Sequence, residues 1–137
     1  MMPGLFDANS AAYVLGSLML DSTKIVDDNY SLTVHDFDHD FYKSIYGAIF
    51  NMANEGISSL EPHEIDIYLA QYPERYGGFK QQNGHKFLDN AIKIASTDRE
   101  KFNYHYSRLK KFTVLRELNN SGFDTKHLYN PNADLID

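Results

Sequence analysis

DFYKSIYGAIFNMAN, which spans residues 40–54, has the clearest helical pattern in the sequence. Apolar side chains recur along one face at spacings of four, three, one and three: Phe41, Ile45, Ala48, Ile49 and Met52. A second apolar face is formed by Tyr42, Tyr46 and Phe50. Because a helix that is apolar on two faces must be covered on both, we expect this helix to lie at the centre of the core.

The flanks of this stretch carry start and stop signals. Asp36, Asp38 and Asp40 lie at or before its first turn, where the helix dipole favours negative charge. Gly56 stands just beyond its end, at a position where helices commonly terminate. The sequence therefore predicts a helix over residues 40–54.

Four further helices are predicted on both sides of this stretch. Asn9 or Ser10 can cap a helix that runs to Leu20, and one or two turns are expected over residues 24–30. Pro62 can begin a helix that ends before Pro73, Gly77-Gly78 is expected to form a turn, and residues 81–84 are expected to form a loop. The remaining helices are expected over residues 84–95 and, from a capping box formed by Thr97 and Glu100, over residues 98–118.

The last residues indicate an incomplete helical hairpin. Residues 119–122, Asn-Asn-Ser-Gly, are poor helix formers, the pattern resumes through Phe123 and Leu128, and residues 132–137 resemble the first turns of another helix. No paired strands are indicated. The predicted fold is all-α: a small helical-bundle head over residues 1–97, then a long helix and the start of a helical hairpin over residues 98–137, together forming one domain.

The composition of the chain excludes several classes of function. The chain has 137 residues, the length of a single domain, with 19 Asp and Glu, 13 Lys and Arg and a net charge of −6, so a surface that is basic throughout is excluded. The absence of Cys excludes a disulfide framework and a Cys nucleophile. The longest apolar run, residues 13–20, is too short to span a membrane and lacks a preceding basic segment. We expect a cytoplasmic protein of a bacterial or phage-infected cell that does not contact the membrane.

The cluster His35-Asp36-Phe37-Asp38-His39-Asp40 could provide imidazole and carboxylate metal ligands. It lacks the Gly and Glu of a calcium loop, and the favoured interpretation is an acidic helix N-terminus. A metal-dependent enzyme built on His35, Asp38 and His39 is the alternative. Residues 78–86 approach a phosphate-binding loop but have the wrong glycine spacing and His in place of Lys. We therefore predict no catalytic, cofactor-binding or metal-binding residues in this chain.

Residues 99–116 carry six cations and a single carboxylate. This basic strip could dock phosphate or an acidic partner, with Tyr104 and Tyr106 available for stacking, or it could be a solvated face offset by the domain's own carboxylates. We expect DNA binding by this chain alone to be weak or absent. The strip consists of Arg99, Lys101, Arg108, Lys110, Lys111 and Arg116.

The order of these landmarks resembles the N-terminal domain of DnaB-type replicative helicases. Residues 10–21, SAAYVLGSLMLD, are similar to the opening helix of that domain, and His35-Asp36-Phe37 with residues 46–56 is similar to its next block. The later landmarks follow in the same order: Gly77-Gly78, a helix start near Thr97, residues 114–118 (VLREL) and residues 129–134 (YNPNAD).

The resemblance implies a non-catalytic domain that forms dimers or the collar of a hexameric ring and docks primase or a helicase loader. ATP and Mg are then expected only in a following RecA-like domain. The candidate interface residues are Leu115, Leu118, Phe123 and Leu128, which we expect to be exposed. Residues 80–84 and 119–122 depart from the family pattern, which leaves open whether the primase surface is retained, and this divergence suggests a phage or mobile-element origin.

A second hypothesis is a stand-alone protein that mimics this domain and blocks or recruits a host replication helicase or loader. The sequence does not separate the two hypotheses.

Overall fold

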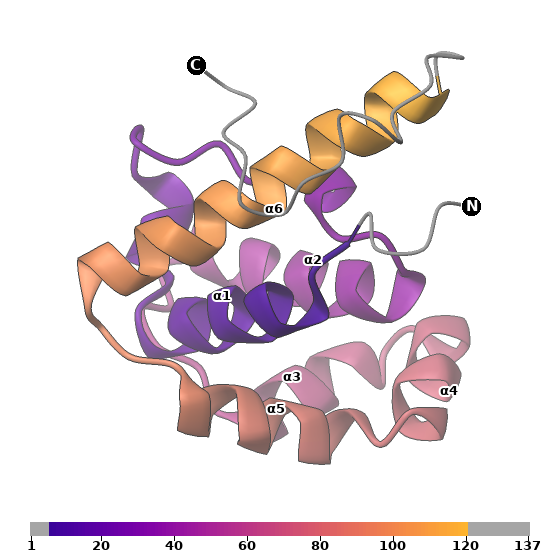
Figure 1. Cartoon of the computed structure of the whole chain (residues 1–137). Coiled ribbons are helices and arrows are strands. Elements are labelled where there is room, and N and C mark those ends of the chain that lie inside the picture. The colour runs from indigo at the N-terminus through magenta and orange to yellow at the C-terminus, as the bar shows by residue number, and fades with distance from the viewer. Residues whose placement is uncertain (1–5, 121–137) are drawn as a thin grey trace.

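In the computed structural model, which describes residues 6–120, the chain forms six α-helices and two short 3₁₀ turns, with no strand among the described residues (Figure 1). The all-α prediction is confirmed. The elements are α1 (Ala8–Leu20), η1 (Ser22–Val26), η2 (Val34–Asp36), α2 (Asp40–Asn54), α3 (Pro62–Leu69), α4 (Pro73–Gln81), α5 (Gly84–Ile94) and α6 (Arg99–Asn120).

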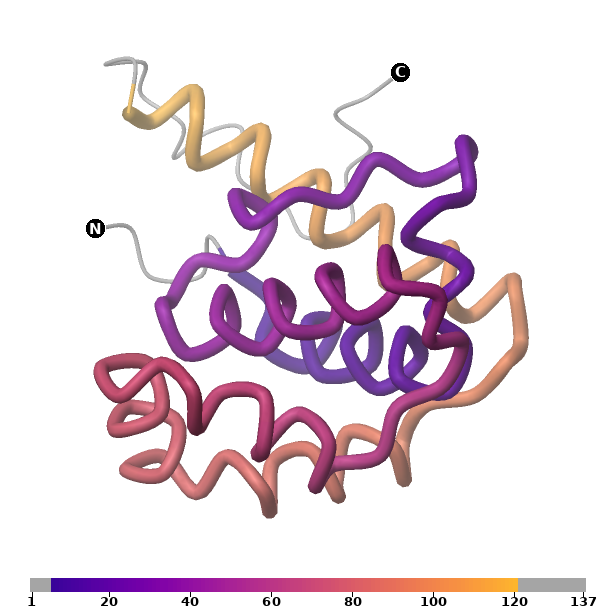
Figure 2. Tube along the Cα trace, turned by 180° about the vertical axis from the view of Figure 1, so that it is seen from behind, coloured from indigo at the N-terminus to yellow at the C-terminus, as the bar shows by residue number. Residues whose placement is uncertain are grey.

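The helices are stacked in three layers (Figures 1 and 2). α1 and α2 form the middle layer, α3, α4 and α5 cover one side of it, and α6 crosses the other side. Phe102 and Leu109 of α6 belong to the same buried cluster as the apolar residues of α1 and α2. The first half of α6 is therefore part of the core, and the division expected at residue 97 stays a prediction.

The central position predicted for residues 40–54 is confirmed. Phe41, Ile45 and Ile49 of α2 are buried in the core cluster, as are Ala48 and Met52. The second face is covered only in part, because Tyr46 is buried whereas Phe50 is 41% exposed.

α1 begins at Ala8, before either of the expected caps, and has a different cap. The Asp7 carboxylate accepts the Ser10 backbone N–H at 3.0 Å, so Asp7, and neither Asn9 nor Ser10, is the N-cap. Ser10 instead lies inside the helix and is fully buried. The helix packs so closely on α5 that a Cβ added to Gly16 would lie 2.2 Å from the Ala91 carbonyl oxygen.

Two expectations for residues 73–84 are wrong. Gly77-Gly78 is not a turn but lies inside α4, because Pro73 opens a helix that buries Phe79 in the core. The expected loop shrinks to Gln82 and Asn83, and Asn83 takes a left-handed conformation with φ 55°. This tight turn allows α5 to start at Gly84 directly against the Phe79 ring.

The long helix was placed correctly but its cap was not. The Asp98 side chain accepts the backbone N–H groups of Glu100 and Lys101, so Asp98 takes the capping role expected of Thr97. α6 also continues through Asn119 to Asn120, two residues beyond the predicted end. Phe123, Leu128 and the helix start expected at residue 132 lie outside the described residues.

The α1–α5 crossing predicts opposite effects for two Gly→Ala substitutions in helices. Gly16→Ala should lower the free energy of unfolding by about 2 kcal/mol, because the new methyl group overlaps the Ala91 carbonyl. Gly47→Ala, in α2, should raise it by up to about 1 kcal/mol, since a Cβ there meets no atom within 4 Å and Ala favours the helix. Urea unfolding followed by circular dichroism measures both, and equal midpoints for the two variants would contradict the close crossing.

Candidate functional site

One face of α6 is polar and lies against the segment between η1 and α2. This segment, residues 27–38, carries four Asp and no Lys or Arg, and we name it the acidic loop. It runs alongside α6 (Figure 2). The α6 side chains that contact it recur at helical spacing and form a single stripe: Arg99, Asn103, Tyr106, Lys110, Thr113 and Arg116.

Asp36 is the centre of this contact. Its side chain is fully buried, and it accepts the Thr33 backbone N–H at 2.9 Å. The Lys110 ammonium donates to it at 3.1 Å and the Thr113 hydroxyl at 2.6 Å. Sequence reasoning placed this carboxylate at a helix end and missed its role. The spacing of Thr33 and Asp36 indicates only the capping box around η2 and not the contact of Asp36 with α6.

The two ends of the acidic loop are tied to α6 by more exposed contacts. Asp27 lies 3.7 Å from Arg99, and Asp38 lies 3.7 Å from Arg116. The Arg116 guanidinium also donates to the His35 carbonyl at 2.7 Å. Three cations of the basic strip are therefore paired with three carboxylates of this loop.

Arg108 is paired on another side of α6, with the carboxylate of Asp7 at 2.7 Å. Burial of Asp7 favours its neutral form, but the hydrogen bond from the Ser10 N–H and the Arg108 charge outweigh burial, so the pKa of Asp7 is lowered. Of the other members of the strip, Lys101 is exposed and Lys111 is buried. Within residues 6–120, carboxylates of the domain thus engage at least four of the six cations, and docking of a partner on this strip stays a prediction.

The structure also brings together Asp7, Ser10 and His105, a combination of residue types used in hydrolases. The Ser10 hydroxyl lies 2.8 Å from His105 Nδ1 and 3.2 Å from the Asp7 carboxylate. Ser10 is fully buried. In a catalytic triad the acid orients the histidine, whereas here the Asp7 carboxylate contacts the serine. Burial lowers the pKa of His105, which stacks on Tyr13 with ring centroids 4.3 Å apart. The cluster therefore fastens α1 to α6 and offers no accessible nucleophile.

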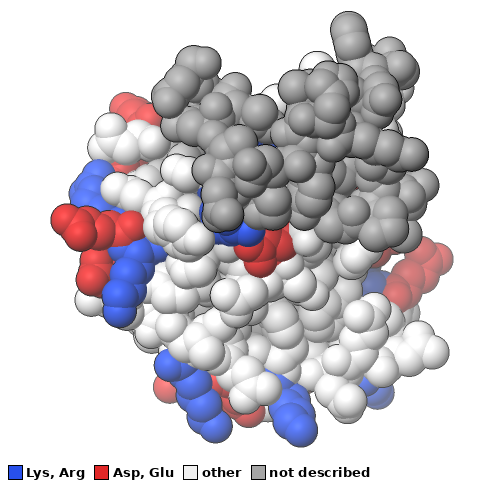
Figure 3. Space-filling model, viewed as in Figure 1, with Lys and Arg blue, Asp and Glu red and all other residues white. Residues whose placement is uncertain are grey.

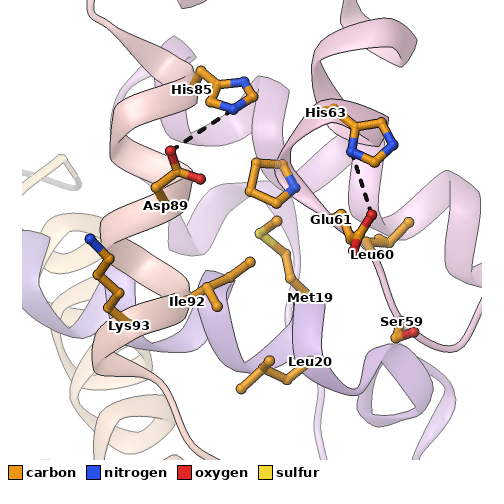
Figure 4. A pocket seen from close by; sticks show the side chains of 11 residues that line it. Met19, Leu20, Ser59, Leu60, Glu61, His63, His85, Asp89, Ile92 and Lys93 are labelled. Atoms are coloured by element: carbon orange, nitrogen blue, oxygen red, sulfur yellow. Dashed lines mark ion pairs between the residues drawn. The ribbon is translucent and has the colours of Figure 1, made fainter.

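An open groove lies between the end of α1, the start of α3 and α5 (Figure 4). Its volume is about 810 Å³. Charged and titratable side chains stand on both sides: His63 is 3.5 Å from Glu61, and His85 is 3.9 Å from Asp89. The apolar lining consists of Met19, Leu20, Leu60, Pro62 and Ile92. Such a groove suits an apolar side chain or helix of another protein better than a charged small molecule.

The predicted interface residues have different surroundings. Leu115 is fully buried, so the expectation that its side chain is exposed is wrong: it lies on a part of α6 where Phe112 and Thr113 are buried as well. Leu118 is half-buried, and Phe123 and Leu128 lie outside the described residues. A role for Leu118 in assembly stays a prediction.

The predicted cluster at residues 35–40 is spread over different surroundings. Asp36 is buried against α6, whereas His39 is exposed and its ring lies 5.7 Å from that of Phe6. Within residues 6–120, no group of three or more His, Asp or Glu is arranged to hold a metal ion. No helix in this part of the chain is both long and apolar enough to cross a membrane.

Charged side chains are interspersed on the face seen in Figure 3, where blue and red groups lie next to each other along one edge. Most of the visible surface between them is uncharged. For the part of the chain described, this face carries no continuous basic patch.

The layered helices, the open groove and the ion pairs between α6 and the rest of the chain define a small all-α domain. The family model for the DnaB-like helicase N-terminal domain matches residues 6–111, and the chain belongs to this family. A relative, the SPbeta prophage-derived uncharacterized protein YorI of Bacillus subtilis (strain 168), is 37% identical over 134 residues. The match covers 97% of this chain but 26% of the relative, and no solved structure gave a significant match. The prophage origin of the relative agrees with the expected phage source.

The lowered pKa of Asp7 predicts that part of the domain's stability is lost in acid. A carboxylate with a lowered folded-state pKa stabilises the fold above its unfolded pKa, near 3.8, and this stabilisation is lost as the pH falls through the folded value. Asp7→Asn keeps a capping side chain but removes the charge, so it should cost about 1 kcal/mol at pH 7 and flatten the fall in stability below pH 4.

Urea midpoints between pH 2 and pH 7 measure this effect. Asp28→Asn, at an exposed carboxyl of the acidic loop, is the control and should leave the pH profile close to that of the parent. Identical profiles for Asp7→Asn and the parent would show that the Asp7–Arg108 pair does not contribute.

Proposed function

We propose that this chain is the N-terminal assembly and docking domain of a phage-type replicative DNA helicase. The observation that carries the proposal is the family match over residues 6–111. The relative supports it, because the matched region is only 26% of a much longer protein. This is the proportion expected of an N-terminal domain that is joined to an ATPase domain. The same length difference favours a domain of a helicase over a stand-alone mimic.

In this proposal the chain contributes binding and no reaction. ATP and Mg are bound by a following RecA-like domain, and the domain described here associates with copies of itself in a dimer or ring collar. Primase or a helicase loader docks on it. The α1–α3–α5 groove is the docking surface that the geometry supports best, since Leu20 and Ile92 line an open depression on the side of α1 opposite α6.

Self-association predicts a concentration-dependent mass in sedimentation experiments on this chain. Leu118→Asp should weaken the association at least about tenfold, because burying a charge in an apolar contact is costly. Ile67→Asp, at a side chain of α3 that is 63% exposed, is the control and should have no effect. A monomer at all concentrations would refute the assembly role, while leaving the docking role to be tested separately.

Docking predicts direct binding of purified primase or loader from the same replication system. Ile92→Asp places a charge in the groove and should weaken binding about tenfold or more, whereas Ile94→Asp, at a residue of α5 that does not line the groove, should not. Titration calorimetry measures both, and circular dichroism verifies the fold. Equal binding by the two variants would place the docking surface elsewhere.

A further inference from the structure

The loop-facing stripe of α6 has the composition of a phosphate-binding surface. Arg99, Lys110 and Arg116 lie on it, and the first and last of them are 17 positions apart, a length of about 26 Å along a helix. Cations at this spacing on one helix face can follow a phosphate backbone. In the described structure each of the three instead contacts a carboxylate of the acidic loop.

One aromatic ring, that of Tyr106, lies between two of these cations, Arg99 and Lys110. It is stacked on the buried ring of Phe102, with the ring centroids 6.3 Å apart. Tyr30 of the acidic loop covers Tyr106 edge-on at 5.0 Å, and the Arg99 guanidinium lies over the Tyr30 ring at 5.8 Å. A stacking ring among cations suits the bases and phosphates of single-stranded nucleic acid, whereas an acidic peptide would use only the cations.

The acidic loop is held over this stripe by polar contacts and by packing of Tyr30 and Leu32 against the core cluster. The two outer pairs, Asp27–Arg99 and Asp38–Arg116, keep about 30% of their carboxylate side chains exposed. Exposed pairs of this kind contribute little to stability and are weakened by salt. Tyr106 also accepts the Ser31 backbone N–H at 2.9 Å, and Lys110 donates to the Ser31 carbonyl at 3.1 Å. The strongest attachment is the buried Asp36, and Phe37 anchors the end of the loop in the core.

We propose that α6 carries a binding face for single-stranded DNA and that the acidic loop occupies this face in the closed domain. The three loop carboxylates pair with the cations that phosphates would contact, and Tyr30 packs edge-on against the Tyr106 ring on which a base would stack. The closed domain therefore binds single strands weakly, and displacement or neutralisation of the loop exposes the site. This site goes beyond the proposed assembly and docking role, because it needs neither self-association nor a protein partner.

The test is the affinity of the chain for a fluorescent single-stranded oligothymidine, measured by anisotropy at several salt concentrations. Asp27→Asn/Asp36→Asn/Asp38→Asn should bind about tenfold or more tightly than the parent at low salt. The slope of log K against log salt should steepen by roughly 2, which is about 0.7 for each of three added phosphate contacts.

A charge-matched control separates a local site from a general gain of positive charge. Glu55→Gln/Glu74→Gln/Asp89→Asn removes three exposed carboxylates outside the acidic loop and α6, and it should change the affinity less than twofold. Adding Arg99→Gln and Arg116→Gln to the loop variant should abolish its gain. An equal gain in the control, or no gain in the loop variant, would overturn the proposal.

Two further measurements cover the cases in which the triple variant does not fold or the site binds an acidic peptide. If the triple loop variant does not fold by circular dichroism, Asp27→Asn/Asp38→Asn leaves the buried Asp36 intact and should still steepen the salt slope by about 1.4. Competition with poly-glutamate distinguishes an acidic peptide from nucleic acid. Displacement of the oligonucleotide by poly-glutamate at equal charge concentration, together with no effect of Tyr106→Leu on DNA affinity, would overturn the assignment to single-stranded DNA.

Discussion

The buried carboxylate of Asp36 is the constraint around which one side of the molecule is organised. A charge with no exposure to water must be compensated by donors within the fold, and here a backbone N–H, an ammonium and a hydroxyl supply them. Two of these donors, Lys110 and Thr113, come from α6, more than 70 residues away in the chain. Satisfying Asp36 therefore fixes how η2 and the second half of α6 lie against each other.

The opposite side of the molecule depends on close packing instead of charge. α1 approaches α5 at Gly16 closely enough to exclude a methyl group, and Gly84 allows α5 to begin against the Phe79 ring. These contacts place α5 beside α1 and leave the groove between the end of α1, α3 and α5. Close backbone packing therefore holds α1 of the middle layer to α5. On the other side of the molecule, ion pairs and hydrogen bonds hold the acidic loop to α6.

Local sequence patterns predicted most of the fold, because the helices that matter most have strong apolar stripes. Residues 40–54 were identified to the residue, and α3 and α5 were close. The errors occurred where tertiary contacts override local preference: Gly77-Gly78 stays helical because Pro73 and Phe79 determine α4. Caps were misassigned where several polar residues stood side by side, as at Asp7 and Asn9 or at Thr97 and Asp98. The pairing of Asp36 with Lys110 has no local signal, since the two residues meet only in the folded chain.

The basic strip is ambiguous for the same reason: the partners of its cations are set by contacts that form only in the folded chain. From sequence, six cations on one helix of an acidic protein suit either an external anion or internal carboxylates. The structure shows Arg99, Lys110 and Arg116 facing the acidic loop and Arg108 facing Asp7, so internal pairing accounts for much of the charge in the closed domain. Internal pairing does not remove the chemistry of a cationic and aromatic stripe; it makes binding there depend on competition between phosphates and tethered carboxylates. Because the loop carboxylates are part of the same chain, their high effective concentration favours the closed form, and only a ligand that engages several cations at once can displace them.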